Sequence, residues 1–288
     1  MKKNYFFSAV LAIAAAVACT EKGPVDFPIQ GDFTLYGENV AEQEVGVFVT
    51  SEGLPQSNLL YTGAKGEGAV ALTAKAEKAG FKQGNHTIYA YAPYAEGAEL
   101  TAVPVDYSKQ STVAFDPLAD DEILAGLMLS YNSTAQSVLY ATTEVTELSS
   151  AAITLPFAAV NPLTEVTVGE PGLEGTNANA QEGKKVTKIV VTCDKPIAYT
   201  GQTLDLTTGM LVGGTAVNSI DIAADMTVKK MGYVTANGFT FKTCLTEEEV
   251  ATAKFKIEMV METGKTYAAE DKTPSYGGIY ALTLTEVE

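Results

Sequence analysis

The chain is built from short segments in which apolar and polar residues alternate, separated by turn residues. A period of two is the repeat of a β-strand with one buried face, and several such runs between turns indicate an antiparallel β-sandwich. Abundant Val, Thr and Ala favour the same class. We therefore expect an all-β protein, with alternating runs at 33–36, 45–50, 58–61, 87–91, 111–115, 138–142, 152–157 and 164–168.

The length of the chain predicts two such sandwiches. Its 288 residues exceed what one sandwich domain usually needs. Residues 169–185 are rich in Gly, Asn and Glu and contain almost no large apolar residue, which is typical of a linker or a long loop. We expect an N-terminal domain over 32–168 and a C-terminal domain over 186–288.

Local signals in the C-terminal half predict two hairpins and one helical turn. Thr208-Gly209 separates two short apolar runs. Asn237-Gly238 is the dipeptide that a type I′ hairpin turn prefers, because both central residues need positive φ. Thr246 and Glu249 have the spacing of a capping box, so a short helix is expected to begin there.

The last two strands have apolar residues at alternate positions. In 255–261 the residues Phe255, Ile257, Met259 and Met261 are expected to face the core. In 278–285 the same pattern puts Tyr280, Leu282 and Leu284 on one side of the strand.

The N-terminus has the features of a lipoprotein signal peptide. Two lysines precede an apolar run, and the run ends at Ala18-Cys19. The run is shorter than the roughly 20 residues that span a bilayer. We expect residues 1–18 to be removed and Cys19 to be acylated, which makes the protein an outer-membrane lipoprotein. An ordinary secretory peptide with an incidental Cys19 is the alternative.

Residues 19–31 are expected to tether the lipid to the folded chain. The segment contains Gly23, Pro24 and Pro28. Val25, Phe27 and Ile29 alternate with other residues, so the tether can also lie down as an edge strand.

Net charge limits the partners. The formal charge is −16, and every basic residue is lysine. Such a surface repels nucleic acid and anionic lipid, so we expect no nucleic-acid partner and membrane contact through acyl chains alone.

The residues do not form a recognisable catalytic or metal site. His86 is the only histidine, and no nucleophile motif accompanies it. One histidine and two later cysteines are too few for a structural zinc site. The acidic residues of 116–122 do not have EF-hand spacing and are expected to form a solvated turn. We expect no enzyme activity, no metal and no cofactor.

Two further questions stay open from the sequence. Cys193 and Cys244 could form a disulfide in an oxidising compartment, or Cys193 could be a small core residue beside Ile189 and Val191. Tyr89, Tyr91 and Tyr94 could stack on a sugar, so a monomeric glycan-binding surface lipoprotein is the alternative function.

The order of several segments resembles the fimbrillin family, the lipoprotein precursors of type V pili in Bacteroidetes. A departure is Ala158, where members of the family often have a histidine after the phenylalanine. The segments that resemble the family are 45–49, 87–94, 121–125, 153–157, 186–191, 203–209 and 277–284.

The resemblance implies two tandem transthyretin-like (immunoglobulin-like) β-sandwich domains that assemble by strand donation. The partners would be other pilus subunits or further copies of the chain, and the assembly would support adhesion to a host or bacterial surface ligand. Our candidate donor residues are Val25, Phe27 and Ile29 at one end and Tyr280, Leu282 and Leu284 at the other; ordinary edge strands are the alternative. In the family a protease typically cleaves after an arginine, and this chain has none. A different protease would act, or the chain would keep its lipid as an anchor or accessory subunit.

Overall fold

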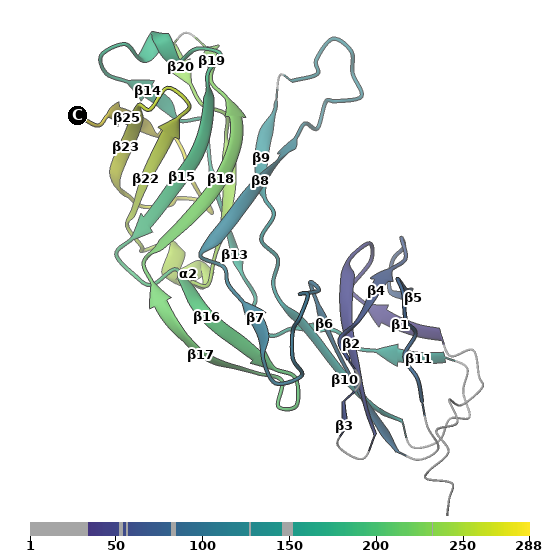
Figure 1. The fold of residues 1–288 in the computed structure, drawn as a ribbon. Coiled ribbons are helices and arrows are strands. Elements are labelled where there is room, and N and C mark those ends of the chain that lie inside the picture. The colour runs from purple at the N-terminus through teal and green to yellow at the C-terminus, as the bar shows by residue number, and fades with distance from the viewer. Residues whose placement is uncertain are drawn as a thin grey trace, which may run out of the picture.

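The computed structural model describes residues 34–51, 54–55, 57–81, 85–126, 128–145, 152–231 and 233–288. Almost every element in these ranges is a strand (Figure 1). The helices among them are the 3-10 helix η1 (Ala178–Gln181) and the single turn α2 (Glu247–Val250). The all-β class expected from the sequence is confirmed.

The first module is a nine-stranded sheet that curls around its own core. Its strands are β1 (Thr34–Glu38), β2 (Glu44–Ser51), β3 (Leu54–Pro55), β4 (Leu59–Gly63), β5 (Ala69–Ala74), β6 (His86–Ala92), β10 (Leu139–Val145), β11 (Ala152–Leu155) and β12 (Ala158–Ala159). They pair in the order β11-β1-β5-β4-β2-β6-β10-β12, and β3 lies beside β2. Val45, Val47 and Val49 alternate inward along β2, as a period of two requires.

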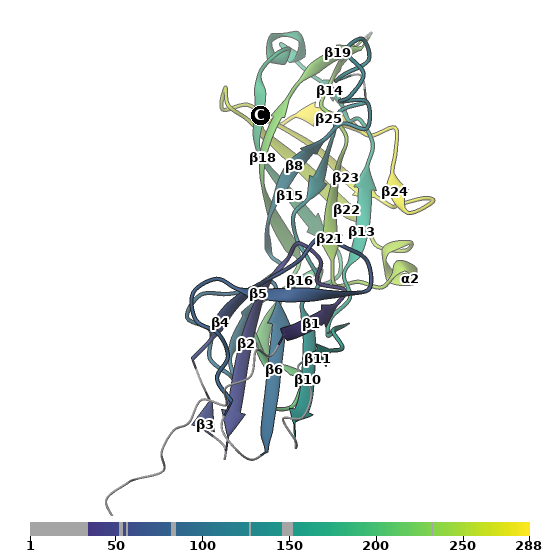
Figure 2. The same cartoon turned by 90° about the vertical axis from the view of Figure 1, so that its right-hand side faces the viewer.

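The second module contains a thirteen-stranded and a three-stranded sheet. The larger sheet consists of β8 (Lys109–Phe115), β9 (Ser130–Ser133), β13 (Thr164–Val168), β14 (Gly172–Glu174), β15 (Lys185–Cys193), β18 (Ser219–Thr227), β19 (Lys229–Met231), β20 (Tyr233–Thr235), β21 (Phe239–Thr243), β22 (Phe255–Met261), β23 (Thr266–Lys272), β24 (Gly278–Ile279) and β25 (Thr283–Glu286). The smaller sheet has β7 (Val103–Val105), β16 (Ala198–Asp205) and β17 (Met210–Val217) in the order β17-β16-β7. The two modules lie end to end (Figure 2).

The second module has the larger core. The larger sheet follows the order β19-β20-β14-β25-β23-β22-β15-β18-β8-β9-β21-β13-β24 and wraps around this core. Phe241 and Phe255 meet edge to face in it, with ring centroids 5.6 Å apart. On β22 the residues Phe255, Ile257, Met259 and Met261 are all buried, which confirms the predicted alternation.

The modules share side chains at their junction. Phe48 and Tyr91 belong to the first sheet, but they pack in the core of the second module. The hydroxyl of Tyr140 on β10 donates to the carbonyl of Leu206, at the tip of the β16–β17 hairpin, over 2.8 Å. The Leu206 amide in turn donates to Leu100 O over 3.0 Å. The hairpin therefore joins the second module to the first.

The sheets divide the chain at other places than the expected boundary at 169–185. Strands β7, β8 and β9 lie between β6 and β10 in sequence, yet they pair in the second module. The expected linker contains β14, which pairs with β20 and β25. Alternation along a strand identifies its buried face but not its neighbour, so the sequence could not indicate these pairings.

One predicted hairpin is present and one is wrong. β16 and β17 pair antiparallel across Thr208-Gly209, with Gly209 at φ +68°. Asn237-Gly238 has no positive φ, and the strands on its two sides pair with different neighbours. Asn237 is buried, and its side-chain amide donates to Thr227 O over 3.3 Å. A Cβ on Gly238 would lie 3.1 Å from Val168 O, so this glycine permits a close crossing rather than a turn.

Candidate strand-exchange site

The C-terminal segment, defined as residues 278–286, runs beside residues 167–174 in one parallel ladder. It begins with Thr167 opposite Gly278, where β13 pairs with β24. It ends with Glu174 opposite Thr285, where β14 pairs with β25. Parallel pairs are slightly less stable per residue than antiparallel ones and are usually found in sheets covered by helices.

Backbone hydrogen bonds hold the two segments together between their paired strands. The amide of Gly169 donates to Ile279 O, and that of Gly172 donates to Leu282 O, each over 2.8 Å. A Cβ on Gly169 would lie 3.1 Å from the ring of Tyr280. Glycine therefore lets this ring lie close to the backbone of the neighbouring segment.

The C-terminal segment buries apolar side chains between two other strands. β25 lies between β14 and β23, where Leu284 is completely buried and Leu282 nearly so. Tyr280 is 54% exposed, so the expectation that it shares a face with these leucines is wrong. Ala281 has φ +52°, which breaks the alternation, and Ile279 points inward instead.

The loop of residues 273–277 connects the C-terminal segment to β23. Ser275 and Gly278 exchange backbone hydrogen bonds of 2.7 and 3.1 Å, which close this loop. Tyr276 is fully exposed and has φ +54°. A residue other than glycine costs roughly 1 kcal/mol in this conformation. The closed loop is therefore strained relative to an extended one.

A cavity of about 780 Å³ lies beside this loop. Leu163, Leu245 and Val250 are among the residues that line it, together with the loop from Pro274 to Gly277. β24 pairs only with Thr167 and Val168 of β13, so it leaves the beginning of that strand's edge uncovered next to the cavity. An extended segment longer than β24 would find two things there: free backbone groups of β13 with which to pair, and the apolar cavity, which can receive a side chain.

An ion pair holds the end of the C-terminal segment. Glu286 pairs with Lys265, and its side chain is only 13% exposed. The hydrogen bond that the Lys265 ammonium group donates to the Glu286 carboxylate raises the pKa of Lys265. The hydroxyl of Tyr267 and the second carboxylate oxygen of Glu286 are buried without a hydrogen-bond partner. Burial raises the pKa of Tyr267.

Four residues predicted to act in anchoring or exchange lie outside the described part of the chain: Cys19, Val25, Phe27 and Ile29.

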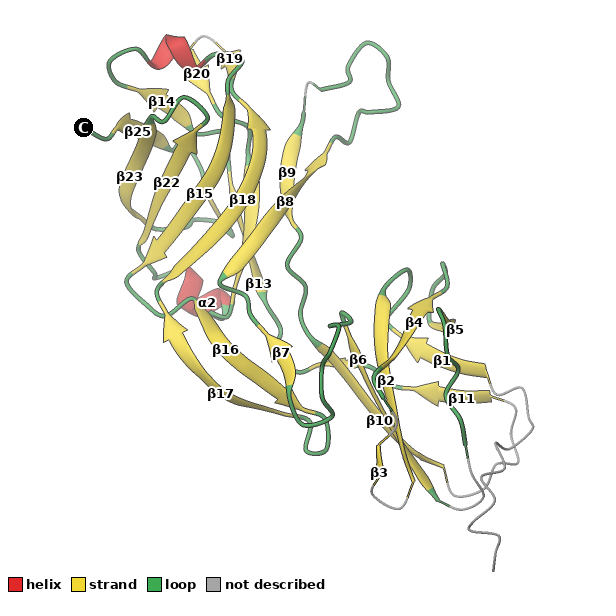
Figure 3. Cartoon of the chain, viewed as in Figure 1, coloured by secondary structure: helices red, strands yellow, loops and turns green. Residues whose placement is uncertain are grey.

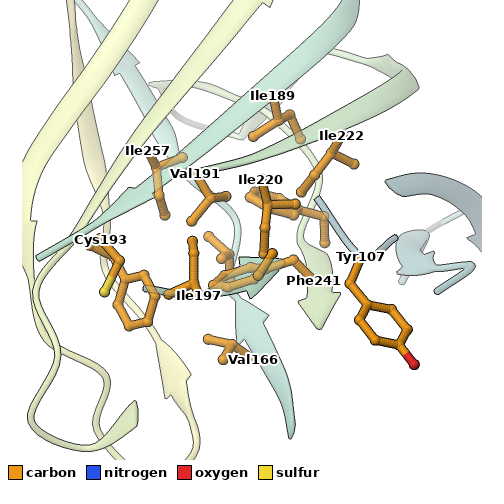
Figure 4. Close-up of a cluster of buried hydrophobic side chains, with 14 of the residues drawn as sticks. Tyr107, Val166, Ile189, Val191, Cys193, Ile197, Ile220, Ile222, Phe241 and Ile257 are labelled. Atoms are coloured by element: carbon orange, nitrogen blue, oxygen red, sulfur yellow. The ribbon is translucent and has the colours of Figure 1, made fainter. Parts of the chain in front are cut away.

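Cys193 and Cys244 are free thiols, so the structure does not contain the disulfide that the sequence left open. Cys193 is buried beside Ile197, in a cluster that includes Val191 and Ile189 (Figure 4). Burial raises the pKa of the Cys193 thiol to about 11. This cysteine is a core residue, which is the second of the two expectations.

The tyrosines considered for sugar stacking lie at the junction of the modules. Tyr91 is completely buried, and its hydroxyl accepts from the Asn58 side-chain amide over 2.9 Å and donates to Ala95 O over 3.0 Å. Tyr94 lines a separate cavity of about 640 Å³. Tyr89 packs against the core of the second module. Tyr91 therefore presents no ring face to a ligand.

The remaining polar candidates have structural surroundings. His86 is buried edge to face against Phe81, with ring centroids 5.6 Å apart. Asp116 and Asp121 accept backbone amides within the loop that joins β8 to β9 (Figure 3). The described ranges contain no group of three or more metal-ligating residues. They also contain no helix long and apolar enough to cross a membrane.

The sequence did not indicate two features of the site. The parallel ladder runs through Gly169 and Gly172, which the sequence placed in a linker. The ion pair joins Glu286 of β25 to Lys265, the residue just before β23, and the alternation of apolar residues cannot predict that these two strands pair. The glycines were the available signal, because a close approach of two backbones often requires glycine.

No family model matches the chain, and no curated protein matches it. Similar solved structures include fimbrial proteins, "putative cell adhesion" proteins and "putative polysaccharide binding proteins" of Bacteroidetes. A "putative cell adhesion protein" from Bacteroides ovatus is 16% identical with a TM-score of 0.39, covering 89% of this chain and 95% of that one. A fimbrial assembly protein from Parabacteroides distasonis is 14% identical with a TM-score of 0.32, covering 87% and 90%. The tip fimbrial protein Mfa3 from Porphyromonas gingivalis, truncated at its C-terminus, is 8% identical with a TM-score of 0.29, covering 84% and 82%. Because all three TM-scores lie below 0.5, the function of this chain has to be sought in its own residues.

Proposed function

We propose that this chain is a non-enzymatic, fimbrillin-like surface subunit that joins its neighbours by exchanging the C-terminal segment. It would serve as a pilus subunit, an anchor or an accessory lipoprotein, and would support cell adhesion. The observation behind the proposal is the parallel ladder, in which the last strand of the chain is inserted between β14 and β23.

Exchange between chains would change few contacts. We call the space between β14 and β23 that β25 occupies the groove. A segment donated by a neighbour can fill this groove with the same leucines and the same ladder of hydrogen bonds. Only the loop of residues 273–277 has to open, and opening relieves the left-handed conformation of Tyr276. The closed and exchanged forms would thus have similar energy, and subunit concentration would decide between them.

The cavity beside the loop supports the same proposal. It continues the groove past the short strand β24, along the uncovered beginning of β13. A donated segment that is extended through its loop would reach this hollow. The Tyr276 side chain, fully exposed in the closed form, would then be available to fill it.

Exchange can be tested by removing residues 277–288 and examining the ladder of oligomers on gels. We expect the ladder to disappear. Two matched variants within the segment separate exchange from surface effects. Leu284→Asp, at a buried position, should abolish the oligomers larger than a dimer, whereas Tyr280→Asp, at an exposed position, should leave them. Species larger than a dimer that persist in the truncated chain would remove the C-terminal donor from the proposal.

Anchoring through Cys19 is the second part of the proposal. We expect radiolabelled palmitate to be incorporated into the chain and lost in Cys19→Ala. The mass of the mature protein from cells should equal that of residues 19–288 plus acyl groups. A mature mass without acyl groups, starting further along the chain, would instead indicate a subunit released from its lipid by proteolysis.

A further inference from the structure

The outer edge of β17 is an unusually unprotected sheet edge. Natural sheets protect their edges with charged residues, proline, bulges or very short strands, because an open edge recruits further strands. β17 ends its sheet and pairs only with β16 among the described strands. It has eight residues, and none of them is charged or proline.

The other strands that end a sheet in the described ranges are protected or short. β12 and β24 have two residues each. β7 contains Pro104, and β19 contains Lys229 and Lys230. β11 has four residues, half the length of β17. β17 is therefore the longest of these edge strands in the described ranges, and it contains neither a charged residue nor a proline.

β17 also exposes apolar side chains. Met210 is 65% and Val212 51% exposed, and they alternate with Leu211, which packs against the core. The four residues that follow, 213–216, are small and all exposed. The open edge therefore has two large exposed side chains in its first half and only small residues in 213–216.

We propose that β17 pairs antiparallel with β17 of a second copy of this chain. The distribution of charge favours a second copy as the partner. No charged residue lies between Asp205 and Asp221, although the net charge of the chain is −16. Two copies repel each other over most of their acidic surface, and this stretch lets them approach without facing charges.

The residues of β17 complement themselves about a two-fold axis through Gly213. In that register Met210 lies opposite Ala216 of the second copy, and Val212 lies opposite Gly214 of the second copy. Each large exposed side chain thus lies opposite a small residue of the second copy. Gly213 and Gly214 both have positive φ, so the two strands bend at the same place, next to the axis. The pairing is isologous and closes after two chains.

Light scattering combined with size exclusion over a range of concentrations tests this pairing on the purified chain. We expect a reversible dimer. Val212→Glu should raise its dissociation constant at least about tenfold, because the two-fold axis repeats the change and brings the two carboxylates to diagonal positions. Val113→Glu is the matched control, since Val113 is also a strand valine and is 56% exposed. It should leave the dimer unchanged.

An equimolar mixture of Val212→Glu and Val212→Lys should restore dimerisation, because the diagonal charges are then opposite. A chain that stays monomeric at all concentrations would overturn the proposal. So would a dimer that survives Val212→Glu, or one that Val113→Glu disrupts. A dimer formed by exchange of the C-terminal segment would survive Val212→Glu and be lost in Leu284→Asp, so the two modes of association are distinguishable.

Discussion

Replacing Gly46 by alanine should destabilise the protein strongly, because the ring of Tyr91 lies where the new Cβ would be. An ideal Cβ at Gly46 would lie 2.1 Å from Cε1, 2.4 Å from Cζ and 2.7 Å from the hydroxyl of Tyr91. Carbon atoms in contact prefer about 3.5–4.0 Å, so the ring would have to move by roughly 1.5 Å. Gly46 lies opposite Tyr91 in the β2–β6 pairing, so neither strand can shift alone.

The ring has little room to move. Tyr91 is completely buried between the modules, and its hydroxyl bonds to Asn58 and Ala95. Overpacking a core costs about 1–3 kcal/mol, and leaving a buried hydroxyl without its partners costs about 1–3 kcal/mol more. We expect Gly46→Ala to lower the free energy of unfolding by about 3–5 kcal/mol.

Urea unfolding followed by circular dichroism measures this loss. Tyr91→Phe keeps the ring but removes the hydroxyl, and should cost about 1–2 kcal/mol. In a Tyr91→Leu background the clash is relieved, so Gly46→Ala should cost less than about 1 kcal/mol there. A Gly46→Ala protein within about 0.5 kcal/mol of the parent would refute this account of the junction.

Three further outcomes are expected. Leu284→Ala should lower the free energy of unfolding by about 3 kcal/mol in urea titrations, because the side chain is completely buried, whereas Tyr280→Ala should cost less than about 1 kcal/mol. Thr246→Ala should cost about 1 kcal/mol in the same assay, since it removes the capping box of α2, and no loss would mean that the box contributes nothing. Cys193 should resist iodoacetamide at pH 8 in the folded protein and react after unfolding, because a pKa of about 11 leaves its thiol protonated; mass spectrometry that finds rapid native alkylation would contradict its burial.

Local sequence patterns predicted the individual elements well. Phe255 and the three apolar residues that alternate with it are buried as a half-buried strand requires. The capping box forms between Thr246 and Glu249, where the Thr246 amide lowers the pKa of the Glu249 carboxyl. Each of these features depends on residues within one turn or one strand, so the sequence contains the whole signal.

Features that depend on distant strands could not be predicted. Asn237-Gly238 has the residues of a tight turn, but the strands on its two sides pair with different neighbours: β20 pairs with β14, and β21 pairs with β13. Ala281 interrupts the last strand because the chain has to pass from β13 to β14 along the ladder. The resemblance to fimbrillins predicts that the C-terminal segment is a donor. The burial of Leu282 and Leu284 identifies these two leucines as the side chains that would fill the groove in exchange.

Disulfide trapping between two differently labelled chains tests strand exchange most directly. Glu174 and Thr285 lie opposite each other in the parallel ladder, with both side chains exposed, and paired strands are close enough for a disulfide. One chain carries Glu174→Cys and the other Thr285→Cys, each with Cys193→Ala and Cys244→Ala, and the two are produced together.

If the C-terminal segment of one chain fills the groove of another, non-reducing gels will show a disulfide-linked pair of the two chains. Thr283→Cys in place of Thr285→Cys should link poorly, since Thr283 lies opposite Gly172. The contrary result is clear: Glu174→Cys and Thr285→Cys combined in one chain form an internal disulfide, while the mixture of single variants yields only monomers.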